Sequence, residues 1–299
     1  ANQLPVDVRD YFGESDEFHM GFHFPLMPRI FMALAKGNAS PIHWIISQTP
    51  EIPEKTQWCT FLRNHDELTL EMVTEEERQS LWNEYAPEPR MRLNLGIRRR
   101  LAPLLDNDQR KILLANALLY SLPGAPIIYY GDEIGMGDNI WLFDRNGVRT
   151  PMQWDDSVNA GFSKADPEKI YSPVIDSDEY SFKKVNVQTL KRDSNSLLNK
   201  MKQLVSIRKS LPIFALGDYE FLANDQPEFL VVHRYHKGQD LLCLHNLTDV
   251  ENSLIMDMSA FENKNLTDLF TGDDYGRIPE HVMAFGLDPY QFLWLEISD

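Results

Sequence analysis

A short apolar run over residues 58–62 ends in five consecutive polar or charged side chains, those of Arg63, Asn64, His65, Asp66 and Glu67. A strand buried in a core gains nothing from such an ending, because each buried polar group needs a partner or costs stability. In barrel enzymes the catalytic residues stand at the carboxyl ends of strands. The pattern therefore predicts part of an active site directly after a strand.

A second apolar run, residues 125–130, ends at Gly131, Asp132 and Glu133. We interpret this run as another buried parallel strand with acids at its end. Two explanations of Asp132 and Glu133 have equal weight. Either they cap the next turn or pair with an arginine, or they line a substrate pocket.

The composition limits the ligands that such a site can bind. The 299 residues carry a formal net charge of −16, and the pI is about 4.9. This balance argues against nucleic acid and anionic membranes as partners, because both need a basic surface. It argues more weakly against a polyanionic substrate, whereas a neutral substrate fits easily. No apolar run approaches the ~20 residues of a membrane helix.

Cysteine and metal-ligand patterns point to no cofactor. Cys59 and Cys243 fall in what we interpret as different domains, which predicts no disulfide and favours a reducing cytoplasm. Neither lies in a metal-ligand spacing, and no set of acids follows the calcium-loop spacing. The sequence therefore predicts no cofactor in this chain.

The residues around the polar cluster predict alternating strands and helices. Residues 19–24 are expected to form a short strand, followed by helices over 25–34 and 41–48. Residues 56–62 are expected to form the strand that carries the cluster. Such alternation is typical of consecutive strand–helix units in a barrel or a doubly wound sheet.

The elements that follow include two clear helix signals and one long connection. Thr74 can cap a helix while Glu77 reaches back to it, which is the pattern of a capping box. Residues 112–122 are apolar on all sides, which predicts a buried helix. Residues 135–193 are rich in Asp, Asn, Gly and Pro, and a connection this long is usually functional or covers a site. An amphipathic helix is predicted over residues 194–210.

From about residue 217 the hydrophobic pattern changes to a period of two, with strands predicted at 229–235, 240–247 and 291–297. We therefore expect an antiparallel β domain at residues 213–299 and the strand–helix units in residues 1–212. The first part holds too few units to close an eight-stranded barrel. We thus expect further strands that precede this chain.

Several stretches resemble a known family. Residues 63–67 resemble a signature of the α-amylase superfamily of glycoside hydrolases, and residues 123–136 resemble its last barrel strand and exit loop. Residues 149–154, Arg-Thr-Pro-Met-Gln-Trp, resemble the α-glucosidase branch that acts on short α-glucosides. Longer stretches resemble trehalose synthases, which interconvert maltose and trehalose; they are residues 22–29, 65–74 and 85–92.

The resemblance implies a (β/α)8 TIM barrel, with residues 1–212 as its C-terminal portion and an antiparallel β-sandwich at residues 213–299. It also implies that the parent enzyme interconverts maltose and trehalose, small neutral disaccharides, by retaining intramolecular α-glucosyl transfer. In such a mechanism an Asp attacks the anomeric carbon, a Glu protonates the leaving oxygen, and a third acid stabilises the distorted sugar.

Only the third acid has a match in this chain. The resemblance assigns Asp66 as the transition-state stabiliser and His65 as the partner that hydrogen-bonds a hydroxyl of the same glucose. The family's nucleophile lies in an earlier strand, and its general acid stands directly before an Ala-Asn-Gln such as residues 1–3. We therefore expect the chain to lack both groups and to be inactive alone, because one carboxylate cannot fill both roles.

Other residues are assigned by resemblance to the substrate or its surroundings. Arg149 would hold the non-reducing glucose, with anchoring of its own loop as the alternative. Arg63 would support a carboxylate, with a surface ion pair as the alternative. The remaining candidates for lining or enclosing the pocket, each weighed against a local structural role, are Asn2, Asn64, Glu67, Glu71, Asp132 and Glu133.

Aromatic and basic segments also have two explanations each. Trp141 and Phe143 are candidates for stacking on a sugar face, although aromatic residues are more often core. Trp154 is expected in the core. The three arginines at residues 98–100 are expected on a solvated helix face.

Three alternatives stay open. A hydrolytic α-glucosidase would share Asp66 and His65. The chain could instead be a non-catalytic half-barrel that pairs with its missing N-terminal half or forms a homo-oligomer. A carbohydrate-binding β domain is the third, although Tyr219, Tyr235 and Tyr290 have no predicted position. Calcium, if bound at all, is expected in the missing N-terminal half, and the expected location is the cytoplasm.

Overall fold

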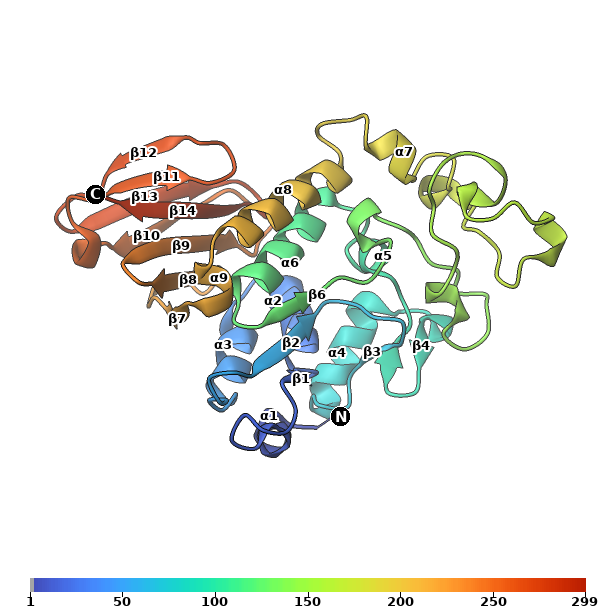
Figure 1. Cartoon of the computed structure of the whole chain (residues 1–299), viewed down its shortest axis with the longest axis horizontal. Coiled ribbons are helices and arrows are strands. Elements are labelled where there is room, and N and C mark those ends of the chain that lie inside the picture. The colour runs from blue at the N-terminus through green and yellow to red at the C-terminus, as the bar shows by residue number, and fades with distance from the viewer. Residues whose placement is uncertain (1–2) are drawn as a thin grey trace.

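Three short parallel strands lie side by side in the first part of the chain, in a computed structural model that describes residues 3–299 (Figure 1). They are β1 (Met20–Phe22), β2 (Gln57–Phe61) and β6 (Ala125–Ile127), and they neighbour each other in chain order. Phe22 pairs with Cys59, and Cys59 pairs with Ala125. Parallel neighbours joined by helices are the arrangement that the alternating pattern predicts.

Two helices connect β1 to β2. They are α2 (Leu26–Lys36) and α3 (Ser40–Ser47), within two residues of the predicted ranges. α2 ends at Gly37, whose φ of +56° is left-handed and therefore suits glycine. The strand–helix–helix–strand order from residue 20 to 61 is therefore as predicted.

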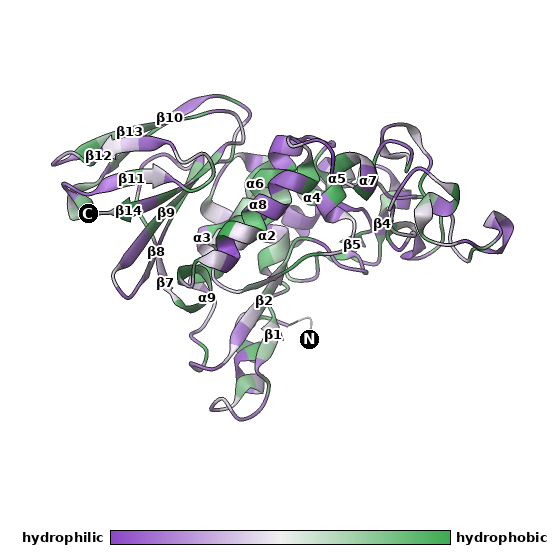
Figure 2. Ribbon diagram, turned by 45° about the horizontal axis from the view of Figure 1, so that its top comes forward, coloured by the Kyte–Doolittle hydropathy of each residue, from purple (hydrophilic) through white to green (hydrophobic). Residues whose placement is uncertain are grey.

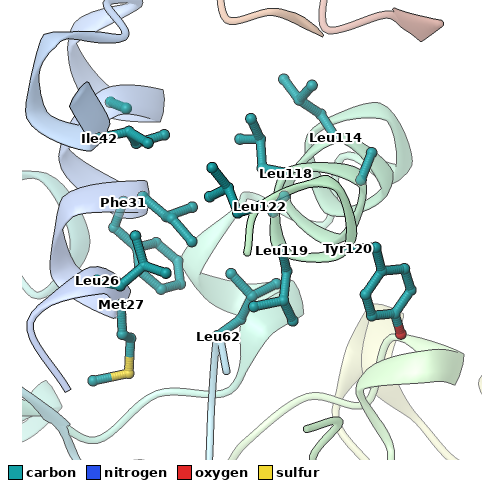
Figure 3. Packing of buried hydrophobic residues seen from close by; sticks show 14 of the residues in the cluster. Leu26, Met27, Phe31, Ile42, Leu62, Leu114, Leu118, Leu119, Tyr120 and Leu122 are labelled. Carbon is teal, nitrogen blue, oxygen red and sulfur yellow. The ribbon is translucent and has the colours of Figure 1, made fainter. Parts of the chain in front are cut away.

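The core of this part lies between α2 and α6 (Gln109–Ser121), as Figure 3 shows. Asp108 caps α6 by accepting a hydrogen bond from the backbone N of Arg110 at 2.9 Å. Leu62, directly after β2, belongs to the same buried cluster as Leu26 of α2 and Leu119 of α6 (Figure 3). Burying one such leucine stabilises the fold by about 1.5–3 kcal/mol, so this contact fixes the strand end against the helices.

The capping box is present at the start of α4 (Glu75–Tyr85). The Thr74 hydroxyl accepts from Glu77 N at 3.2 Å, and the Glu77 carboxylate accepts from Thr74 N at 2.9 Å. The remaining elements of this part are α1 (Pro5–Val8), β3 (Leu68–Thr69), β4 (Arg92–Leu93), β5 (Gly96–Ile97), α5 (Leu101–Leu104), α7 (Val187–Leu190), α8 (Leu197–Ser210) and α9 (Ile213–Leu216). The strands β3, β5 and β4 form a small antiparallel sheet next to the polar cluster.

The connection over residues 135–193 lies at the end of the molecule opposite the β domain (Figure 1). It consists of loops, short 3-10 turns and the four-residue helix α7. Figure 2 shows hydrophobic residues gathered on the central helices and many hydrophilic residues along this connection. The predicted long loop is therefore present and packs beside the sheet ends.

The β domain is a sandwich of two antiparallel sheets. Six strands follow the order β12-β11-β14-β9-β8-β7, and β10 pairs with β13 in a second sheet. Their bounds are β7 (Asp218–Phe221), β8 (Phe229–His236), β9 (Gln239–Asn246), β10 (Asn252–Asp257), β11 (Asn265–Asp268), β12 (Asp274–Arg277), β13 (Val282–Leu287) and β14 (Phe292–Ser298). One cluster of buried side chains from both sheets joins them, as period-two alternation predicts.

The predicted burial of residues 125–130 is wrong. β6 covers only Ala125–Ile127, and Ile127, Ile128 and Tyr130 are exposed. The reason is that β6 pairs only with β2 and forms an edge of its sheet. An apolar run predicts a buried strand only when neighbours cover both faces.

Both cysteines are free and buried. No helix in residues 3–299 is long and apolar enough to cross a membrane.

Candidate active site

Arg63 holds the polar cluster in place at the end of β2. Its side chain is buried, its Nε donates to the Arg99 carbonyl at 2.6 Å, and its Nη2 donates to the Asp66 carbonyl at 2.9 Å. Burial lowers the pKa of Arg63 to about 10, against the opposing pull of Asp132, so the guanidinium stays charged at neutral pH. Arg63 thus fixes the backbone of Asp66 and does not contact its carboxylate directly.

The Asp66 carboxylate is positioned by a tight turn. The side chain of Asn64 accepts from Asp66 N at 2.8 Å, and Asp66 Oδ1 accepts from Glu67 N at 3.0 Å. The side chain of Asp66 keeps 39% of its surface exposed. A carboxylate with a fixed backbone and an open side can accept hydrogen bonds from a bound polyol.

Arg145 crosses from the long connection to bind this carboxylate. Its Nε donates to Asp66 Oδ1 and lies 3.0 Å from Glu67 Oε2, while its Nη1 reaches Asp144 at 2.8 Å. Burial acts to raise the pKa of Asp66, but hydrogen bonds with Glu67 and Arg145 outweigh it and hold that pKa well below its usual range. Asp66 is therefore a carboxylate anion under all ordinary conditions.

Glu67 behaves differently from its neighbour. Burial raises the pKa of Glu67, and the adjacent Asp66 carboxylate raises it further. Asn94, from the turn between β4 and β5, donates to Glu67 Oε1 at 2.8 Å. Two adjacent acids thus have pKa values moved in opposite directions, an arrangement common at functional sites.

The loop that delivers Arg145 is built around Arg98. Asn139 N donates to the Gly147 carbonyl at 3.1 Å and closes the loop 139–147. The Arg98 guanidinium fills its centre and donates to three carbonyls, those of Ile140 (3.1 Å), Leu142 (2.7 Å) and Asp144 (2.6 Å). A Cβ at Gly147 would come within 2.2 Å of the Asn139 carbonyl. Only glycine fits there, so the loop closes tightly.

Arg149 links the polar cluster to a second cleft. Its Nε donates to the His65 carbonyl at 2.7 Å, and both residues are exposed. Arg149 also lines a cleft of about 630 Å³ together with Glu133, Tyr130 and Trp154. Glu133 accepts from Gly131 N at 2.7 Å, which caps its own turn. Glu133 therefore caps its own turn and also lines this cleft, and its role toward a substrate stays a prediction.

Asp132 lies in the interior beside two arginines. It is buried, and its Oδ1 lies 3.7 Å from Arg100 Nη1. Burial raises the pKa of Asp132 to about 7, while the charges of Arg100 and Arg63 oppose that rise. Asp132 therefore sits behind the strand ends, where it balances buried positive charge.

The structure brings part of the predicted set together. Arg63, Asn64, Asp66 and Glu67 form one hydrogen-bonded group, and His65 joins it to Arg149. Glu71 lies exposed on the segment before α4. Asn2 lies outside the described residues. The roles assigned to these residues stay predictions.

Two predictions about neighbouring residues are wrong. The arginines at 98–100 precede α5 and face inward: Arg98 fills a loop, Arg99 pairs with Asp138 at 2.9 Å, and Arg100 is fully buried. Trp154 is 49% exposed and lines the cleft beside Arg149. In both cases the packing partner is a loop distant in sequence, which local periodicity does not reveal.

The sequence pattern missed Arg145, Asn94 and Arg98. Each reaches the cluster or its loop from a segment 27 or more residues away, and none stands in a recognisable motif. The turn signal Asp-Arg-Asn-Gly at residues 144–147 marks a loop but does not say which partner Arg145 binds.

The chemistry available to the cluster is that of one accessible, anionic carboxylate with polar neighbours. Within residues 3–299 no group of three His, Cys, Asp or Glu side chains is placed to hold a metal ion. Glycosyl transfer needs carboxyl groups on two sides of one bond, and Asp66 and Glu67 are joined to the same arginine. The cluster therefore suits sugar binding and charge stabilisation.

Two family models match consecutive parts of the chain. The α-amylase catalytic domain matches residues 96–217, and the maltogenic amylase C-terminal domain matches residues 219–294. A solved α-amylase from H. orenii superimposes with a TM-score of 0.70 at 21% sequence identity, covering 100% of this chain and 52% of that one. The predicted fold class, part of a TIM barrel followed by an antiparallel β domain, is thereby confirmed.

Curated relatives are similar over the whole chain. A trehalose synthase/amylase from Mycobacterium tuberculosis is 48% identical, with 100% of this chain and 51% of the relative covered. A trehalose synthase from Pimelobacter sp. is 46% identical, with 100% of this chain and 54% of the relative covered. The chain thus spans about half the length of the curated relatives it matches.

Proposed function

The chain belongs to the α-amylase superfamily of glycoside hydrolases, and from this premise we propose that it forms part of an enzyme that interconverts maltose and trehalose. The reaction moves an α-glucosyl group within one disaccharide and consumes no water. The proposed class of reaction is retaining transfer through a glucosyl-enzyme. The relatives named as trehalose synthases support it.

One observation carries the assignment of Asp66. Its carboxylate is held at the end of a parallel strand, is half exposed, and has a pKa kept well below the usual range although burial opposes this. An anion with those properties can stabilise the positive charge that develops at the anomeric carbon in the transition state. His65 and Arg149 stand beside it and would bind the same sugar.

We propose that this chain does not catalyse the transfer alone. Asp66 and Glu67 share Arg145 on one side of the site, so they do not supply a nucleophile and an acid across a glycosidic bond. The strands β1 and β6 each have one unpaired edge in the three-stranded sheet. Further barrel strands, on an upstream polypeptide segment, would pair with these edges and bring the two missing groups.

The loop 139–147 and Arg145 would limit the access of water to the glucosyl-enzyme. Arg145 already covers Asp66, and its loop is fixed by three bonds to Arg98. Exclusion of water is what separates transfer from hydrolysis. The candidates Glu67 and Glu71 would help to enclose the released glucose.

A product assay separates this proposal from a hydrolytic α-glucosidase. We would add maltose to the chain together with the part of the Pimelobacter trehalose synthase that the chain does not match, and follow products by NMR. Trehalose as the main product would support isomerisation. Glucose alone would overturn the proposal in favour of hydrolysis.

Two further assignments follow from the same proposal. We place the domain boundary at residue 212/213, so that the last turn α9 belongs with the β domain. We also propose a cytoplasmic location, because both cysteines are free and a reducing compartment keeps thiols unpaired. The partner molecules would be small neutral disaccharides, in keeping with the net charge of −16.

A further inference from the structure

A second cleft, of about 500 Å³, opens between the loop 139–147 and residues 174–180. Apart from Arg99, the residues that line it belong to the long connection at the end of the molecule opposite the β domain (Figure 1). Its lining includes Arg99, Asp138, Trp141, Asp176, Glu179 and Tyr180. This set is distinct from the residues that surround Asp66.

Trp141 offers this cleft an open aromatic face. The guanidinium of Arg90 lies over the indole ring, 4.5 Å from its centre. It therefore covers one face of the ring. The residue nevertheless remains 70% exposed, so the other face is available. Such a face suits stacking against the C–H groups of a pyranose ring.

The tryptophan is held before any ligand binds. Its backbone N donates to Asn139 Oδ1 at 3.0 Å, and the carbonyls on both sides, of Ile140 and Leu142, accept from Arg98. A ligand that stacks on the ring therefore binds at a small entropic cost, because the loop is already ordered.

The polar groups of the cleft are also fixed in place. The Asp138 carboxylate accepts from Arg99 Nε at 2.9 Å and from Arg100 N at 2.7 Å, and Glu179 accepts from Asn107 at 3.0 Å. The exposed carboxylates of Asp176 and Glu179 have further lone pairs that can accept from hydroxyl groups of a ligand. Asp138, Asp176 and Glu179 against Arg99 leave a net charge of −2, which repels anions.

We propose that this cleft is an accessory binding site for a neutral saccharide, an α-linked glucose oligomer that stacks on the open face of Trp141. Its hydroxyl groups donate to the carboxylates of the cleft. The inference rests on the proposed function, since it names a second sugar contact for a sugar-transferring enzyme. The site would hold a substrate or a longer glucan near the loop that carries Arg145.

Calorimetric titration of the chain with maltotriose tests the proposal. We expect saturable binding that weakens about tenfold or more in Trp141→Ala and is largely kept in Trp141→Phe. The matched control is Trp44→Ala, because Trp44 is also exposed and also has an arginine, Arg29, 4.5 Å from its ring centre, but it does not line this cleft. Asp66→Asn separates this binding from binding at the candidate active site.

Loss in Trp141→Ala, with binding retained in Trp44→Ala and Asp66→Asn, supports the proposal. Equal binding by Trp141→Ala and the unaltered chain overturns it, and so does the absence of binding or its loss in Asp66→Asn. The trehalose assay above does not measure this cleft. If the product assay yields glucose alone, the proposed function is rejected. The calorimetric result for this cleft does not depend on that outcome.

Discussion

Arg145 and Asp66 form an ion pair that joins the loop 139–147 to the end of strand β2. The two residues are 79 positions apart in the sequence. The pair has two consequences. It keeps the candidate catalytic carboxylate ionised, and it ties that carboxylate to a loop whose shape depends on Arg98.

The first prediction concerns the charge of Asp66. Replacing Arg145 by methionine keeps a long side chain but removes the cation, so the pKa of Asp66 should rise by about 1–3. Carboxyl NMR titration of the two proteins would measure this. Asp155, a half-buried acid whose carboxylate accepts from Ser157 and which lies outside the cluster, serves as an internal reference. An unchanged Asp66 pKa in Arg145→Met would show that the ion pair does not form in solution.

A second prediction concerns the loop itself. Arg98→Met leaves three carbonyls, those of Ile140, Leu142 and Asp144, without their charged donor. Amide exchange at Leu142 and Val148, whose N–H groups bond within this segment, should speed up about tenfold or more. Arg110→Met, on the exposed start of α6, should leave exchange in the loop unchanged. Equal protection in both variants would contradict the central role of Arg98.

The third prediction is a pH dependence of stability. His245 is fully buried, with Nδ1 3.0 Å from the Leu230 carbonyl and Nε2 3.2 Å from Ser121 Oγ. Burial lowers the pKa of His245 to about 4 from an ordinary 6.5, so between these values the unfolded chain binds the extra proton. Stability is therefore fully present above pH 6.5 and is lost as the pH falls to about 4, by about 3 kcal/mol for this residue.

Urea unfolding from pH 7.5 to about 3.5 would measure this contribution, because this range spans both pKa values of His245. His245→Asn should lose less stability over this range than the unaltered chain. The control His281→Asn, at an exposed site, should keep the full dependence. Parallel curves for the unaltered chain and His245→Asn would refute a neutral buried histidine.

A fourth prediction follows from the uncovered face of the parallel sheet. Met20, Phe22 and Ile127 are 50%, 46% and 39% exposed, and the strand register places them on one face. The chain alone should associate or aggregate as its concentration rises, because apolar surface and unpaired strand edges favour it. Light scattering should show less association for Phe22→Lys than for the unaltered chain. The control Tyr171→Lys changes another exposed aromatic residue, outside this sheet, and should leave association unchanged. A monomer at high concentration would count against this.

Local signals predicted the elements that carry the site. Thr74 and Glu77 lie three residues apart and interact within one helical turn, so their capping box was readable from sequence. Likewise, the helix over residues 112–122 is apolar on all sides and is buried in the structure. These features depend on neighbours in the chain and need no knowledge of the fold.

Burial and long-range pairing were not readable in the same way. Trp154 and Ile127 look like core residues, yet each is exposed because little packs over its segment. The arginine that binds Asp66 comes from a distant loop. From the sequence alone, several other arginines could equally well be its partner. Which of them reaches the carboxylate is decided by the closure of the loop around Arg98.

The most direct test of the account is the activity of Asp66→Asn when the chain is combined with the unmatched part of the Pimelobacter trehalose synthase. Asn keeps the size of the side chain and removes the charge. We predict that the combination with the unaltered chain converts maltose to trehalose, and that Asp66→Asn lowers the rate about a hundredfold or more. Asp106→Asn, at an exposed acid paired with Lys111, should retain full activity. Full activity of Asp66→Asn, or conversion of maltose by the chain alone, would contradict the account.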